Sequence, residues 1–132
     1  MEWLVTVHSV WRWAVLLAAV GALVLAAMAA TGSRPWDGNA DRTSFFFTLG
    51  MDIQFVIGTV LWIVQGRWSG ADTLLSWVHP LAMIVAVALA HVGRARADRA
   101  SEDKAKGTQA ALFFGLSLAV VIVAIPFAAW PL

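Results

Sequence analysis

The chain has 132 residues, of which 61% are hydrophobic and only 13% are charged. Soluble domains are roughly half apolar, so this composition predicts a membrane protein. The net charge is +1 and the basic residues share their loops with acidic ones, which argues against a nucleic-acid-binding surface. The chain contains no cysteine, and this excludes disulfides, iron–sulfur clusters and zinc sites built on thiolates.

Four apolar runs are each near or above the roughly 20 residues that a helix needs to cross the hydrocarbon core. Backbone polar groups cannot stay unpaired in lipid, so these runs are expected to be helices. Short connections between four such helices predict an all-α, up-down four-helix bundle that forms a single membrane domain over residues 1–132. The expected helices cover about residues 3–31, 44–66, 72–97 and 102–130.

The basic residues are unequally distributed between the loops. The second loop contains Arg67, and the N-terminus contains no basic side chain. By the positive-inside rule, both termini and the second loop are therefore predicted to lie on the non-cytoplasmic side. The basic residues of the first and third loops are Arg34, Arg42, Arg94, Arg96, Arg99, Lys104 and Lys106.

A few ionisable side chains lie within the apolar runs. Such groups are costly at membrane depth, usually face the interior of the bundle, and are functional hypotheses by default. Gln54 is the main uncharged polar residue that accompanies them. The ionisable residues are His8, Arg12, Asp52, His79 and His91.

His8 and His79 are predicted to lie at nearly the same level near the outer face, given a helix rise of about 1.5 Å per residue. Two imidazoles on different helices of a bundle can act as the two axial ligands of a b-type haem. Small side chains follow both histidines on their helix faces, and Met83 lies one turn beyond His79, so the macrocycle would have room. The alternative interpretation is that these small residues only allow close helix packing.

Arg12 and Gln54 are the other residues predicted to contact the cofactor. Arg12 lies one turn deeper than His8 on about the same face and keeps its charge. We expect it to bind a haem propionate, with Arg67 as a second candidate for that contact. The alternatives are an ion pair with Asp52 or a hydrogen bond to a helix carbonyl. Gln54 shares its helix face with Gly58, and this face suits a polar cofactor or a quinone.

His91 follows His79 by twelve residues, about 18 Å along the helix axis, so one haem cannot use both. The sequence has no further histidine at the level of His91. We expect His91 to be an interfacial residue beside Arg94, and a contact with Asp52 is the alternative. An unpaired buried Asp52 would be protonated or would carry protons.

Several segments carry a family resemblance: HSVWRW, MDIQFVIG and HPLAMIVAVALAHVGR, followed by ALFFGLSLAVVIVAIPFAAWP. They resemble the small four-helix bacterial integral membrane proteins described as cytochrome b-like, and the resemblance covers most of the chain. It implies a b-type haem, with His8 and His79 at the matching ligand positions and Arg12 as the matching arginine. Such proteins often carry a histidine near the position of Asp52, so this sequence argues against a second haem.

The function expected from these features is that of a multi-pass protein of the bacterial inner membrane. It would hold one haem b and pass electrons between a membrane quinol and a redox partner. The expected partners are membrane lipid, a quinone, and other membrane redox subunits or further copies of the chain. The residues predicted to bind the haem are His8 and His79 as metal ligands, with Arg12, Gln54 and Met83 as further contacts.

Other functions remain open at this point. The sequence shows no pair of catalytic carboxylates, no nucleophile with a base and no glycine-rich phosphate loop, which argues against a hydrolase or transferase. The main alternative is a non-haem accessory or assembly subunit of a larger membrane complex, in which histidine and arginine hold helices together. A small ion or proton carrier that uses Asp52 and Arg12 is the third.

Overall fold

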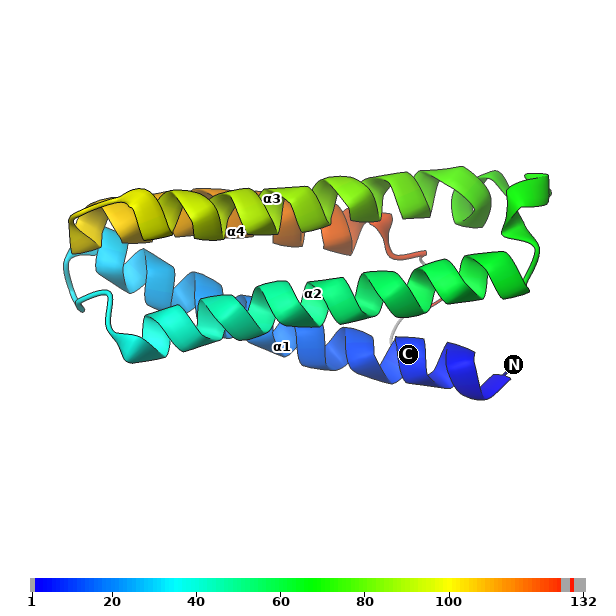
Figure 1. Cartoon of the computed structure of the whole chain (residues 1–132), viewed down its shortest axis with the longest axis horizontal. Coiled ribbons are helices and arrows are strands. Elements are labelled where there is room, and N and C mark those ends of the chain that lie inside the picture. The colour runs from blue at the N-terminus through cyan, green and yellow to red at the C-terminus, as the bar shows by residue number, and fades with distance from the viewer. Residues whose placement is uncertain (1, 127–128, 130–132) are drawn as a thin grey trace.

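The computed structural model describes residues 2–126 and 129, and these form a bundle of four long helices (Figure 1). A short 3-10 turn, η1 (Arg67–Ser69), and a π-helical turn, η2 (Leu74–Val78), lie between the second and third helices. The turn η2 runs directly into the third helix. The prediction of an all-helical, four-helix protein is confirmed. The four helices are α1 (Glu2–Thr31), α2 (Gly38–Val64), α3 (His79–Arg99) and α4 (Asp103–Ala124).

The helices run up and down, and each packs against the next in the chain. The contact between α4 and α1 closes the ring, whereas α2 and α3 share the smallest interface of the four neighbouring pairs. The N-terminus lies at the same end as the α2–α3 connection, and the other two connections lie at the opposite end (Figure 1). In this arrangement α1 and α3 are diagonal partners.

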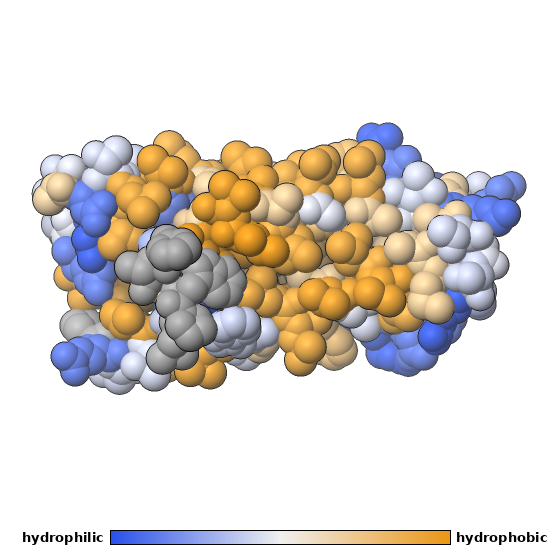
Figure 2. All heavy atoms as spheres, turned by 180° about the vertical axis from the view of Figure 1, so that it is seen from behind, coloured by the Kyte–Doolittle hydropathy of each residue, from blue (hydrophilic) through white to orange (hydrophobic). Residues whose placement is uncertain are grey.

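The four helical spans are long and apolar enough to cross a membrane, which is the organisation expected of a multi-pass membrane protein. On the face shown in Figure 2, apolar residues form a broad band over the middle of the bundle, and polar residues gather at both ends. Many large apolar side chains on the surface of the four helices are exposed, as expected where helices contact lipid.

Helix α2 begins at Gly38, earlier than the predicted start at residue 44. Asp37 caps it, because the Asp37 Oδ1 atom accepts a hydrogen bond of 3.0 Å from the backbone N–H of Ala40. Arg34 donates to the other carboxylate oxygen at 2.9 Å. The Ala40 N–H and the Arg34 guanidinium lower the pKa of Asp37. The polar residues before Phe45 thus belong to the helix and extend it beyond the apolar run.

Helix α4 ends at Ala124, before the predicted end at residue 130. Pro126 has no N–H to donate, and a proline disfavours the helical conformation of the residue before it. Ile125 accordingly has an extended backbone, with φ −68° and ψ 124°. Trp130, at the predicted end, lies outside the described residues.

The end of the bundle away from the N-terminus is tightly packed by small residues. The alanine face of α1 predicted from the sequence is buried, as are Ala86 and Ala90 on α3. At Gly107 on α4 a Cβ atom would lie 2.6 Å from the carbonyl oxygen of Ala26 and 2.8 Å from the carbonyl carbon of Ala29. Only glycine therefore permits this approach of α4 to α1.

We predict that Gly107→Ala lowers the free energy of unfolding by about 1–3 kcal/mol, because the new methyl group would overlap the backbone of α1. The matched control is Gly21→Ala. A Cβ at Gly21 meets nothing within 4 Å, so this variant should be neutral or more stable, by up to about 1 kcal/mol of helix propensity. Denaturant titration of the helical circular dichroism in detergent measures both changes. Equal effects of the two substitutions would contradict the proposed close approach.

Candidate functional site

A cavity of about 530 Å³ lies between the helices towards the end of the bundle that contains the N-terminus. This volume falls within the roughly 300–1,000 Å³ that ligand pockets usually have. All four helices contribute to its walls. The sequence-predicted site residues that line it are His8, Arg12, Gln54, His79 and Met83, together with Arg67.

The cavity exists because α4 ends early. The backbone is extended at Ile125, and Ile125, Pro126 and Ala129 line the cavity where a longer α4 would otherwise fill the bundle. Gly58 on α2 adds room, because a Cβ there would lie 3.1 Å from the Cε1 atom of His8. The buried alanines of α1 and α3 do not line the cavity. For them the alternative interpretation, close helix packing, is the correct one.

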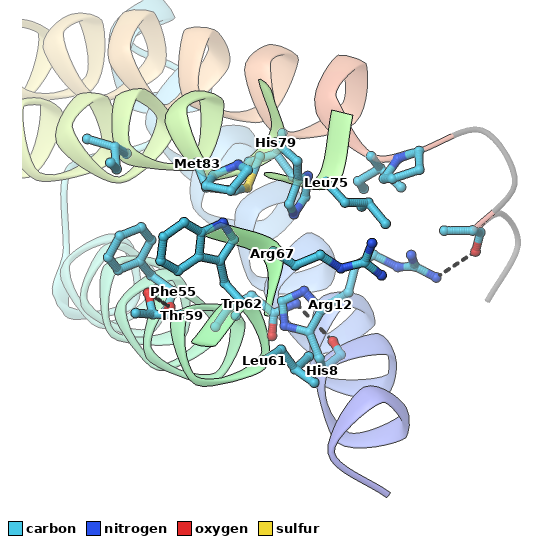
Figure 3. A pocket seen from close by; sticks show the side chains of 18 of the residues that line it. His8, Arg12, Phe55, Thr59, Leu61, Trp62, Arg67, Leu75, His79 and Met83 are labelled. Atoms are coloured by element: carbon cyan, nitrogen blue, oxygen red, sulfur yellow. Dashed lines mark hydrogen bonds between the residues drawn. The ribbon is translucent and has the colours of Figure 1, made fainter. Parts of the chain in front are cut away.

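His8 and His79 project into this cavity from diagonal helices and face one another (Figure 3). Their ring centroids are 6.5 Å apart and their planes are inclined by 80°. Two imidazoles that bind one ion from opposite sides, each through a bond of about 2.0–2.1 Å, have centroids about 6–6.5 Å apart. No group of three or more histidines, aspartates or glutamates suited to a metal ion occurs among the described residues. The pair suits a metal whose other ligands are not protein side chains.

The hydrogen bond of His79 fixes which nitrogen can bind a metal. Its Nδ1 atom lies 2.9 Å from the carbonyl oxygen of Ala124, at the end of α4. A carbonyl can only accept, so Nδ1 carries the proton and Nε2 of the neutral ring keeps its lone pair. Metal-binding histidines are commonly oriented by such a hydrogen bond from the other ring nitrogen.

His8 is held from the side of α2. The Gln54 Nε2 atom donates a hydrogen bond of 2.9 Å to the backbone carbonyl of His8. The Nδ1 atom of His8 and the Oε1 atom of Gln54 are both buried and make no hydrogen bond. Buried polar atoms normally have partners, so the two unsatisfied atoms indicate a site that a ligand would complete.

Two guanidinium groups give the cavity a positive charge. Arg12 is buried, and it donates a hydrogen bond of 3.2 Å to the carbonyl of Ala129 and lies 5.6 Å from the ring centroid of Trp13. Arg67 is half-buried and donates to Gln65 at 3.3 Å. No aspartate or glutamate occurs among the described residues of the lining. The site therefore favours a ligand that carries negative charge.

Pro80 determines a further contact of the wall. Because Pro80 has no N–H, the carbonyl of Ser76 lacks the helical donor it would otherwise have one turn later. The indole Nε1 atom of Trp62 donates to this carbonyl at 2.8 Å and thereby joins α2 to the π-helical turn before His79. The hydroxyl of Ser76 is buried without a hydrogen bond. The sequence pattern does not single out Trp62 or Ala124, because each acts through a contact with a backbone carbonyl.

His91 and Asp52 lie outside the cavity and contact one another. The Nε2 atom of His91 is 2.7 Å from the Oδ1 atom of Asp52. Arg94, expected beside His91, instead donates to the backbone carbonyl of Asp41 at 3.0 Å. The alternative contact with Asp52 is thus the one observed, and an ion pair of Arg12 with Asp52 is not formed.

We predict that Trp62→Phe lowers the free energy of unfolding by about 1–3 kcal/mol, because the carbonyl of Ser76 would lose its indole donor. Trp68→Phe is the control, since Trp68 is exposed and donates no hydrogen bond to a described residue. It should change stability by less than about 0.5 kcal/mol. Thermal unfolding in detergent compares the two variants, and equal losses would show that the hydrogen bond is unimportant.

Comparison with models of protein families, with curated proteins and with solved structures finds no match to this chain. The likeness to cytochrome b-like proteins therefore stays a prediction from the sequence. The function has to be inferred from the cavity, from its two histidines and from its charge.

Proposed function

We propose that the chain is an integral membrane b-type haem protein of the bacterial inner membrane, which passes electrons between a membrane quinol and a redox partner. The observation that carries the proposal is the placement of His8 and His79, with ring centroids 6.5 Å apart in one cavity of a helical bundle. This separation matches two imidazoles on one metal ion.

The charge and polarity of the cavity support a haem over a bare ion. A haem combines a flat apolar body, a metal centre and two carboxylates. The cavity offers apolar side chains such as Met83 and Val87, two imidazoles, and the guanidiniums of Arg12 and Arg67. A bare cation would instead meet two arginines without a single carboxylate among the described lining residues. The set of residues therefore fits the cofactor better than it fits a metal ion alone.

Each residue would have a separate part in holding the cofactor. His8 and His79 would ligate the iron, and the Ala124 carbonyl would keep the Nε2 atom of His79 free for this bond. Arg12 and Arg67 would bind the propionates. When bound, the haem supplies one-electron chemistry that no side chain of the chain offers.

The orientation of the chain completes the proposal. Arg12 and Arg67 are the basic residues that line the cavity, whereas most basic residues of the chain lie in or beside the loops at the other end of the bundle. By the positive-inside rule, we expect the cavity end to lie on the non-cytoplasmic side. A redox partner would then approach from that side, and quinol would arrive from the bilayer. One haem per chain is expected, since His91 makes its contact with Asp52 outside the cavity.

We predict that protein purified after expression with adequate haem supply is red and shows sharp reduced-minus-oxidised absorption bands. His8→Ala and His79→Ala should each abolish the spectrum of a six-coordinate low-spin haem, because each removes one ligand. His91→Ala is the matched control and should leave the spectrum unchanged. Visible absorption measures occupancy, and circular dichroism verifies that every variant keeps its helices.

A colourless wild-type preparation would contradict the proposal that the chain binds a haem. It would favour the accessory-subunit interpretation, in which the close contact of His8 with His79 joins α1 to α3. Loss of haem in His91→Ala would show that the ligands are assigned wrongly.

We predict that Gly58→Leu lowers haem occupancy about tenfold or more, because the side chain would push against the ring of His8 and overpacking costs about 1–3 kcal/mol. Gly58→Ala should stay close to wild type, since its methyl group would lie 3.1 Å from Cε1 and a small ring shift relieves the contact. Val60→Leu, at an exposed position of the same helix, is the second control. Haem titration of the apoprotein separates these outcomes.

A further inference from the structure

The Asp52–His91 pair is placed unusually for an apolar helix bundle. Its hydrogen bond of 2.7 Å joins α2 to α3, yet the side chains remain 44% and 50% exposed on the outside of the bundle. Asp52 lies seven residues beyond Phe45, where the apolar part of α2 begins, and thus about 10 Å inside it. Ionisable residues at such depth almost always face protein or water.

The pair has polar atoms that are not yet bonded. Neither side chain makes another hydrogen bond with a described residue. The Nδ1 atom of His91 and the Oδ2 atom of Asp52 therefore have no hydrogen-bond partner among the described residues, and both side chains are about half exposed. The surrounding surface is apolar, since Val56 and Val92 are 60% and 42% exposed. An unsatisfied polar atom in hydrocarbon costs several kcal/mol, so this face needs a partner.

We propose that the α2–α3 face around Asp52 and His91 binds a second copy of this chain. Two copies with the same orientation in a bilayer, related by a twofold axis along the membrane normal, bring equal residues to equal depth. With a protonated imidazole beside a carboxylate, each pair offers one unbonded donor, the Nδ1–H of His91, and one unbonded acceptor, the Oδ2 atom of Asp52. A second copy offers the same two atoms in the complementary arrangement, so four side chains complete one another's hydrogen bonds.

The neighbouring residues allow a close approach. Ala88 and Ala95 lie one turn before and one turn after His91 on the same face of α3, and Ala88 is exposed. Small residues let the backbones of membrane helices come near enough for side chains to hydrogen-bond across them. The interface is independent of the haem, because neither Asp52 nor His91 lines the cavity.

The absence of cysteine from the chain makes this face directly testable. In vesicles at low protein-to-lipid ratio, Ala88→Cys should form a disulfide-linked dimer on oxidation. Leu116→Cys is the matched control: it is 47% exposed on α4, and it lies at a similar depth because its neighbour Ser117 bonds the carbonyl of Ala86. It should remain monomeric.

The contribution of the polar pair is tested by single-molecule photobleaching of labelled protein in the same vesicles. Asp52→Ala and His91→Ala should each lower the dimer association constant about tenfold, with the helical circular dichroism unchanged. Exchange of the two residues, Asp52→His with His91→Asp, preserves the complementary atoms and should restore dimerisation. This restoration distinguishes the interface from a loss of folding in the single variants.

Two results would overturn the proposal. One is a protein that stays monomeric at every protein-to-lipid ratio, which would mean that lipid or another subunit covers the face. The other is cross-linking through Leu116→Cys in place of Ala88→Cys, which would locate the dimer contact elsewhere.

Discussion

The end of helix α4 at Ala124 is the constraint on which the rest of the site depends. Pro126 prevents the helix from continuing, so α4 ends before it reaches the end of the bundle at which the N-terminus lies. The end of the helix also leaves its last backbone carbonyls without donors from the helix itself. One of them, that of Ala124, accepts a hydrogen bond from the Nδ1–H group of His79. A single proline thus creates the cavity and orients one of the two histidines that face it.

Unpaired carbonyls recur as the means by which this bundle positions its side chains. Apolar helices offer few polar side chains to one another, so a backbone acceptor that a proline or a helix end leaves free can serve as a specific anchor. Trp62 binds the carbonyl that Pro80 leaves without a donor, and Arg12 binds that of Ala129. Gln54 reaches the carbonyl of His8 within an intact helix. The donor side chains of these contacts lie on α1 and α2, and they contribute to the cavity wall.

The sequence is sufficient for the fold class and for some of the residues that line one cavity, but not for the cause of the cavity. Hydropathy and the 3.6-residue period predict four helices and the buried face of α1, because both depend on each residue's own chemistry. Helix rise brings His8 level with His79. The sequence does not determine whether the alanines of that face make room for a ligand or pack against another helix. It also does not determine the start of α2 at Gly38 or the Asp52–His91 contact. Each depends on where another segment lies, and a period along one helix does not contain that information.

One end of the bundle is tightly packed and stabilises the fold, whereas the other end contains the cavity. Towards the α3–α4 connection, Gly107 lets two helices touch and Phe47 packs edge-to-face on Phe114 at 5.2 Å. Towards the N-terminus, the cavity removes such packing and leaves buried polar atoms unsatisfied. A cavity lined by two imidazoles and two guanidiniums destabilises an empty bundle, so the packed half must hold the fold before any ligand binds. Ligand binding would then add stability by mass action, and if the proposed haem binds, the bundle should be most stable with it in place.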